Sequence, residues 1–205
     1  DYSGRDFLYI NNGNGTFTEC LNKSLKHVSF SSMGNDVADF NNDGWTDIVT
    51  LDMMAWDNYG KKASYSSLDR ESLQTLIDLE MNHQYMYNTL QMNTGLTVNS
   101  RIPVFSDIAQ LAGVSSTDWS WGPLIFDMDN DGLKDLFVAN GIRRDFINND
   151  YLAFFEKRYR ELIIPGKLSR DEFIRSVLSR MPNRKKSDCF FRNTGDLTFE
   201  DKKGD

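Results

Sequence analysis

The sequence predicts a mainly β fold made of tandem four-stranded units, the kind that form the blades of a β-propeller, with helical insertions between strands 2 and 3. Two repeated patterns predict this fold: one occurs twice, the other occurs three times, and they alternate along the chain. About two and a half units fit within residues 1–205, so we expect a fragment of a larger propeller. A plain antiparallel sandwich is the alternative.

The first pattern is an acidic loop of nine residues between two short strands. It reads Asp39-Phe-Asn-Asn-Asp-Gly-Trp-Thr-Asp47 and, later in the chain, Asp127-Met-Asp-Asn-Asp-Gly-Leu-Lys-Asp135. Each loop is followed by a short apolar run, Ile48 to Leu51 or Leu136 to Ala139. A short apolar run beside a turn-forming segment is typical of a strand, so each copy predicts a β-hairpin.

The second pattern places an Asn-rich turn with glycine between aromatic or β-branched residues, which also predicts a hairpin. Its three copies begin at Tyr9, Gln91 and Phe191 and lead to Phe17, Phe105 and Phe199. Combining the two patterns gives a half blade at 7–19, a blade at 34–108 and a blade at 122–201.

Both complete units have far more chain between strands 2 and 3 than a turn requires, which predicts helical insertions at 57–87 and 142–188. In the second insertion, Ser169 is a candidate N-cap, followed by Asp171 and Glu172 in the first helical turn. In the first insertion, apolar residues recur at a helical spacing: Leu68, Leu73, Leu76, Ile77 and Leu79.

The acidic loops have the composition of a metal site. Oxygen-bearing side chains at positions 1, 3, 5 and 9 can turn inward, glycine at position 6 permits a bend, and the carbonyl at position 7 adds an oxygen. An all-oxygen cage suits Ca²⁺ better than Mg²⁺. We expect two Ca²⁺ ions, with these ligands: Asp39, Asn41, Asp43, the Trp45 carbonyl and Asp47, and then Asp127, Asp129, Asp131, the Leu133 carbonyl and Asp135.

The loops have two other interpretations, an EF-hand and a solvated turn. An EF-hand requires a bidentate Glu at position 12, where this chain has Thr50 and Val138, and it also requires flanking helices. An EF-hand is therefore excluded. A solvated turn rich in Asp and Asn is the remaining alternative, and two matching copies argue against it.

The loop pattern, preceded by Met33-Gly34 or Trp121-Gly122, resembles the FG-GAP/VCBS repeat of integrin-α-type β-propellers. Three stretches, Asn35 to Gly44, Asp118 to Pro123 and Asn140 to Asp145, resemble a bacterial group related to cartilage acidic protein (ASPIC/UnbV-associated). The resemblance implies Ca²⁺ loops in a propeller of around seven blades. It says little about activity.

Composition excludes several classes of protein. The net charge of −7 argues against a nucleic-acid partner, and no apolar run approaches the length of a membrane span. Two cysteines, Cys20 and Cys189, cannot form a disulfide framework, and we expect buried free thiols. Two histidines, His27 and His83, make a His-rich metal site or a serine-protease-like triad improbable.

These observations favour a non-catalytic, calcium-binding module for ligand binding or adhesion outside the cytoplasm, secreted, at the cell surface or periplasmic. The alternative is an enzyme on a propeller scaffold, a lyase or hydrolase acting on polysaccharide, but the sequence presents no recognisable catalytic constellation. Expected partners are a protein or carbohydrate ligand and either the remaining blades or a second copy of the chain.

Strand direction predicts where a ligand binds. The Ca²⁺ loops lie at one end of the blades and both insertions at the other, where longer loops favour binding. Candidates on that face are Trp56, Trp119, Arg143, Arg144 and Asp145, although packing or capping of the insertions would explain them equally well. The segment from Glu156 to Asp188 contains ten basic and five acidic residues. This excess of positive charge suits an anionic ligand or simply a solvated helical surface.

Overall fold

Two four-stranded antiparallel sheets form the body of the computed structural model, which describes residues 4–63, 70–79, 81–145 and 147–202. Within these ranges the sheets stay separate and none closes into a barrel. The protein is therefore mainly β, and its open sheets are consistent with part of a propeller.

The first sheet has the strand order β4-β5-β7-β8, with every neighbouring pair antiparallel. Two helices lie between β5 and β7 along the chain, and part of the predicted insertion (64–69 and 80, with Leu68) lies outside the described residues. The elements are β4 (Asn35–Ala38), β5 (Asp47–Thr50), α2 (Asn58–Ala63), α3 (Arg70–Asp78), β7 (Thr89–Val98) and β8 (Ile102–Asp107).

The second sheet has the order β9-β10-β11-β12 and repeats this connectivity, with two helices between β10 and β11. The predicted N-cap is confirmed: Ser169 and Glu172 form a reciprocal capping box at the start of α6. Residue 146, inside the predicted insertion, lies outside the described residues. The elements are β9 (Ser120–Phe126), β10 (Asp135–Asn140), α5 (Asn149–Leu162), α6 (Arg170–Leu178), β11 (Cys189–Asn193) and β12 (Phe199–Asp201).

A smaller N-terminal layer precedes the first sheet. The hairpin of β1 and β2 leads through α1 to β3, and β3 pairs in parallel with β6 from the first insertion. A short helix, α4, follows β8. These elements are β1 (Tyr9–Asn11), β2 (Phe17–Glu19), α1 (Leu21–Ser24), β3 (Val28–Ser29), β6 (Gln84–Tyr85) and α4 (Ala109–Ala112).

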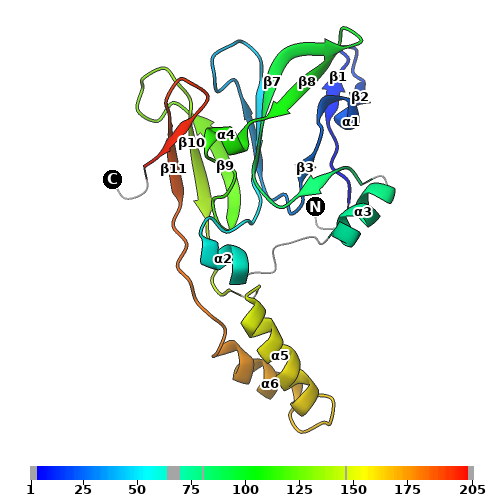
Figure 1. Cartoon of the computed structure of the whole chain (residues 1–205), viewed down its shortest axis with the longest axis vertical. Helices are drawn as coiled ribbons and strands as arrows, with labels where there is room; N and C mark the ends of the chain where they lie inside the picture. The colour runs from blue at the N-terminus through cyan, green and yellow to red at the C-terminus, as the bar shows by residue number, and fades with distance from the viewer. Residues whose placement is uncertain (1–3, 64–69, 80, 146, 203–205) are drawn as a thin grey trace.

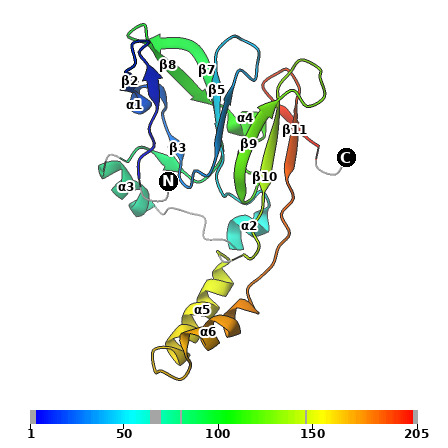
Figure 2. The ribbon, with the colours of Figure 1, turned by 180° about the vertical axis from the view of Figure 1, so that it is seen from behind.

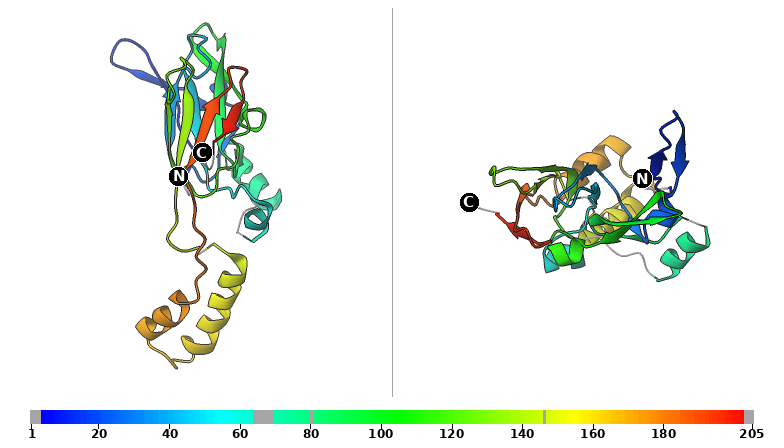
Figure 3. Two further views of the ribbon diagram at one scale, coloured as in Figure 1. Left: turned by 90° about the vertical axis from the view of Figure 1, so that its left-hand side faces the viewer. Right: turned by 90° about the horizontal axis from the view of Figure 1, so that it is seen from above.

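The two ends of the sheets differ, as strand direction requires. Figure 1 shows the two acidic loops and the β7–β8 and β11–β12 turns at one end, whereas α2, α3, α5 and α6 lie at the other. The same division is seen from behind in Figure 2. Helices α5 and α6 form an arm that extends away from the sheets (Figure 3).

One hydrophobic core joins the two sheets. The side chains in this core come from one face of each sheet, and α4 closes it with Ala109 and Ala112. Cys189 lies in this core, and both Cys189 and Cys20 are buried cysteines that are not joined in a disulfide. The main contributors are Val49, Leu51 and Leu90 from the first sheet and Ile125, Leu136, Val138 and Phe191 from the second.

The first strands of the two sheets approach each other closely at Gly34. A Cβ atom on Gly34 would lie 2.5 Å from the Trp121 carbonyl oxygen and 3.1 Å from the Cα of Gly122. Two residues further along the chain, the Asp36 carboxylate accepts the Ile125 N–H at 2.8 Å. The missing side chain at Gly34 therefore sets how closely β4 and β9 can pack.

Replacing this glycine should separate the sheets. We expect Gly34→Ala to lower the free energy of unfolding by about 2 kcal/mol, because backbone atoms must move to make room. Gly122 occupies the same position in the second repeat but has nothing within 4 Å of its would-be Cβ. Gly122→Ala should therefore leave the free energy of unfolding in urea unchanged. An equal loss of this free energy in both variants would contradict the packing argument.

Candidate metal centre

The first aspartate folds each acidic loop back on itself. In the first loop, the two carboxylate oxygens of Asp39 accept the backbone N–H groups of Asp43 at 3.0 Å and Gly44 at 2.9 Å. The equivalent bonds to Asp127 in the second loop measure 3.1 and 3.0 Å. Two loops far apart in sequence thus share one hydrogen-bond framework.

Positive φ angles complete the bend in both loops. Position 4 has φ of 58° at Asn42 and 60° at Asn130, and position 6 has φ of 88° at Gly44 and 89° at Gly132. Asparagine and glycine are the residues that adopt this region at least cost. The sharp bend predicted from the glycine at position 6 is confirmed.

The ninth residue of each loop is a fully buried carboxylate, Asp47 or Asp135, each 0 % exposed. Asp47 accepts the Phe40 N–H at 3.1 Å and the Asn93 N–H at 2.8 Å. Asp135 makes the equivalent bonds at 2.8 and 2.9 Å. This carboxylate therefore ties the start of the loop to the third strand of its sheet.

Burial makes ionised Asp47 costly. Loss of solvent raises the pKa of Asp47 to about 6, although N–H bonds from Asn93 and Phe40 lower it, and the nearby charges of Asp43 and Asp39 raise it further. A cation among these carboxylates would remove that cost, because opposite charge favours the ionised form.

The donor set of the second loop fits a hard cation. Asp127, Asp129 and Asp135 each offer a carboxylate oxygen, and the three oxygens lie within 4.8 Å of one another. Ca²⁺ binds oxygen at about 2.4 Å, so ligands on opposite sides of one ion lie about 5 Å apart. In the first loop, Asn41 occupies the third position, and its amide oxygen is also a Ca²⁺ ligand type.

An arginine from the third strand pairs with the second loop. Arg192 donates from Nε to Asp129 at 2.8 Å and from Nη2 to Asp131 at 2.9 Å. The Leu133 backbone N–H and then Arg192 hold the pKa of Asp131 below its usual range. Sequence reasoning missed Arg192, because it lies far along the chain; its place just before Asn193, in the third copy of the second pattern, is the available signal.

The two loops also contact each other. Asn42 donates its side-chain amide to the Gly132 carbonyl at 2.9 Å and accepts from the Lys134 ammonium at 3.3 Å. Asn193 donates from one amide nitrogen to the carbonyls of Phe40 and Lys134, both at 2.9 Å. The loops are therefore neighbours in one surface rather than independent sites.

Position 7 of each loop, a predicted carbonyl ligand, carries an apolar side chain that lies over a glycine turn. Trp45 lies over Gly95, where a Cβ would be 3.1 Å from its Nε1, and Leu133 lies over Gly195 at 3.4 Å. Trp45 remains 49 % exposed. This contact places the loop beside the turn between strands 3 and 4.

The five residues proposed for the opposite face have different surroundings. Trp56 is 56 % exposed, and Arg143 and Arg144 are also exposed. Arg144 donates to a carbonyl that follows α6 at 3.4 Å. Trp119 and Asp145 are both 6 % exposed and lie within the body of the protein. Only the first three present side chains to solvent.

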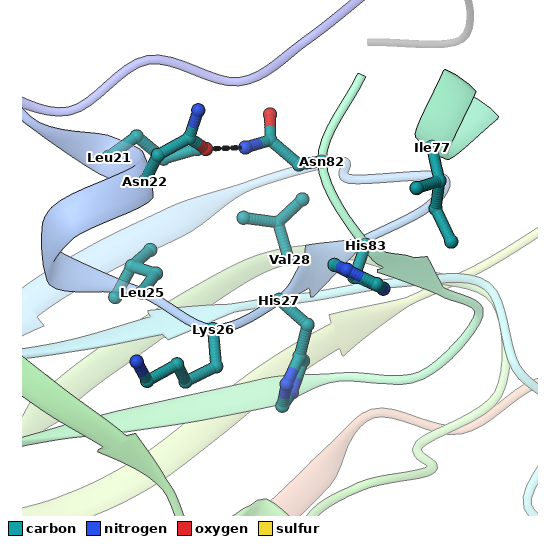
Figure 4. A pocket seen from close by; sticks show the side chains of 9 residues that line it. All are labelled: Leu21, Asn22, Leu25, Lys26, His27, Val28, Ile77, Asn82 and His83. Carbon is teal, nitrogen blue, oxygen red and sulfur yellow. Dashed lines mark hydrogen bonds between the residues drawn. The ribbon is translucent and has the colours of Figure 1, made fainter. Parts of the chain in front are cut away.

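A separate cavity of about 610 Å³ lies between α1, β3 and α3, and its lining includes both histidines (Figure 4). His27 Nε2 lies 2.8 Å from the Asp107 carboxylate and 2.8 Å from the Tyr87 hydroxyl. Burial, and then the charge of Asp107, raise the pKa of Tyr87 to about 12. The parallel pairing of β3 with β6, which the sequence did not predict, brings His27 and His83 together.

The comparison with protein families agrees with this geometry. A family model described as the FG-GAP-like repeat matches residues 1–50, which span β1 to β5 and include the first acidic loop. Residues 1–50 are therefore similar to an FG-GAP-like repeat. No curated protein and no solved structure matches the chain. The second loop lies outside the matched FG-GAP segment but shares the hydrogen-bond framework of the first.

Among the described residues, no helix has the length and apolar character needed to cross a bilayer.

Removing the buried carboxylate should destabilise the fold even without metal. In chelator, we expect Asp135→Ala to lower the free energy of unfolding by about 3 kcal/mol, because two buried N–H groups lose a charged acceptor. Asp135→Asn keeps one acceptor oxygen and should lose about half as much. Glu161→Ala, at an exposed site on α5, is the control; a wild-type urea midpoint for Asp135→Ala would refute the structural role.

Proposed function

We propose that the chain is a calcium-stabilised propeller module that binds a protein or carbohydrate ligand outside the cytoplasm. In this proposal the sheets within 34–108 and 122–201 are blades with helical insertions, and the hairpin within 7–19 is half a blade. The observation that carries the proposal is the shared framework of the two acidic loops, with oxygen donors at the same positions.

Calcium suits these loops on electrostatic grounds. Asp39, Asp43 and Asp47 repel one another when ionised, and the raised pKa of Asp47 reflects burial first and that repulsion to a smaller extent. Extracellular Ca²⁺ modules work with dissociation constants of about 10⁻⁴ to 10⁻³ M, which partly exposed loops of this kind can reach. A bound ion would link the loop to the sheet through Asp47 and its equivalent, Asp135.

The end opposite the loops offers a place for an anionic ligand. A cavity of about 380 Å³ between α2 and the arm is lined mainly by aromatic rings and two guanidinium groups, and its lining also includes Asp150. Arg184 lies 5.2 Å from the Tyr59 ring centre, and Arg180 lies 5.4 Å from that of Phe154. Aromatic faces beside arginines suit an acidic saccharide, and this supports carbohydrate as the ligand class.

The outer face of the second sheet supports a further partner, another sheet of the same repeat. Phe137 pairs across the sheet with both Leu124 and Phe190, which are 50 % and 41 % exposed. In the first repeat the residue equivalent to Phe137 is Val49, which is 0 % exposed beneath the second sheet. The same face is thus covered in one sheet and open in the other.

Calcium titration tests the metal proposal. We expect calorimetry to show two ions per chain and the melting temperature to rise with Ca²⁺, because only the folded form binds; at 100 times the dissociation constant, one site adds about 2.7 kcal/mol. Tb³⁺ excited through Trp45 should report the first loop, and Trp45→Leu, which copies the second loop, should abolish that signal. No uptake, with a melting temperature indifferent to chelator, would refute the proposal.

Ligand binding can be tested with immobilised acidic glycans, while product release is followed in the same samples to detect a lyase or hydrolase. We expect Arg144→Ala and Trp56→Ala to weaken binding several-fold without changing Ca²⁺ uptake, because both side chains are exposed at the helical end. Arg101→Ala, in the β7–β8 turn, is the control. Weaker binding in the control alone would place the ligand at the loop end instead.

The open apolar face makes a prediction about assembly. We expect sedimentation velocity to show concentration-dependent self-association, which Phe190→Lys should abolish by placing a charge on the outer face. Ile164→Lys changes a side chain that is 70 % exposed in the α5–α6 connection and should leave association intact. If the wild-type chain and the Phe190→Lys variant both stay monomeric at high concentration, this prediction is wrong.

A further inference from the structure

The acidic loops share their donors but differ in one neighbouring charge. Asp129 and Asp131, two predicted ligands of the second loop, both pair with Arg192 through separate nitrogens of one guanidinium. The Arg192 side chain is 45 % exposed, so it can leave this position without disturbing the core. Arg192 therefore occupies oxygens that a metal ion in the second loop would need.

The first loop has no such arginine at the corresponding place. The residue before Asn193 in β11 corresponds to the residue before Asn93 in β7, and there the chain has Met92. Met92 is partly buried against the hydrophobic core rather than paired with a carboxylate. The first loop thus presents its carboxylates without a competing guanidinium from its third strand.

We propose that Arg192 is a built-in competitor of Ca²⁺, so that the second loop binds the ion more weakly than the first. This inference rests on the calcium binding proposed above. A cation bound by Asp129 and Asp131 would have to displace the guanidinium or lie beside it, and two positive charges a few ångströms apart repel each other. The loops then fill one after the other as the Ca²⁺ concentration rises.

The displaced guanidinium has a second partner close by. Glu200 in β12 lies directly opposite Arg192 in the strand register. Lys202 and, more weakly, Arg192 already hold the pKa of Glu200 below its usual range. Arg192 can therefore exchange the loop carboxylates for Glu200 by side-chain rotation alone, while β11 keeps its place in the sheet.

The test isolates the second loop. In a background carrying Asp39→Asn and Asp43→Asn, Asp47 is the one charged ligand left in the first loop, and each new amide oxygen can still accept one of the N–H bonds that shape the loop. Calorimetry with CaCl₂ then compares this background with the same protein carrying Arg192→Met, which copies Met92. We expect Arg192→Met to tighten binding about fivefold, since exposed ion pairs contribute modestly.

A charge-matched control separates local from general effects. Arg175→Met removes the same charge from α6, at the opposite end of the molecule, and should leave the affinity unchanged. If the background does not fold, the same comparison can be made in a chain whose first loop is wild type. Terbium luminescence through Trp45 then reports ion binding to the first loop, and subtracting it from the total ion uptake gives binding to the second loop. The Arg192 Nε–H resonance should shift as the second loop fills.

The outcomes distinguish the two proposals. Two ions bound, with equal affinities and no effect of Arg192→Met, would overturn the role of Arg192 and leave calcium binding intact. No uptake by the wild-type chain or by Arg192→Met would overturn calcium binding itself, and the competitor role with it. If the second loop binds Ca²⁺ only with Arg192→Met, or binds it more tightly with that substitution, both proposals are supported.

Discussion

A buried carboxylate at the end of each acidic loop organises the surrounding structure. Asp47 and Asp135 have no exposed surface, and each holds two backbone N–H groups from different segments of its sheet. Because a buried acceptor of this kind is costly to remove, loop shape and strand pairing depend on the same side chain. A change in the loop therefore also alters the third strand of the sheet, which in the second sheet contains Arg192 and Asn193.

Asn193 extends this dependence from one sheet to the next. Its amide joins a carbonyl of the first loop to a carbonyl of the second, and Asn42 adds a second bridge between the loops. At the other end of β4, Gly34 lets the sheets approach until backbone meets backbone. The spacing between the sheets is thus set at two levels, by asparagine side chains bonded to backbone carbonyls at the loops and by backbone contact at Gly34, and the apolar core fills the space between them.

Repetition explains what the sequence could predict. The duplicated loops located both hairpins and the positive-φ glycines, because local sequences that share the same turn-forming residues bend in the same way. The N-cap at Ser169 followed from local chemistry alone. Pairings between distant segments were missed: the parallel contact of β3 with β6, and Arg192 on the second loop. Burial of Trp119 and Asp145 was also beyond sequence reasoning, because it depends on packing between segments that are far apart in the sequence.

The two sheets are stacked, and the two outer faces of this stack differ from each other. On the N-terminal side, the first sheet is covered by Phe7, Leu8 and α1, which surround a cavity of about 240 Å³ against Val37 and Ile48. On the C-terminal side, the second sheet leaves its aromatic face uncovered. Because the two faces are not alike, contacts that extend the stack join unlike surfaces, as in head-to-tail assembly. A stack extended through these faces would have polarity, and its curvature would decide between a closed ring and an open filament.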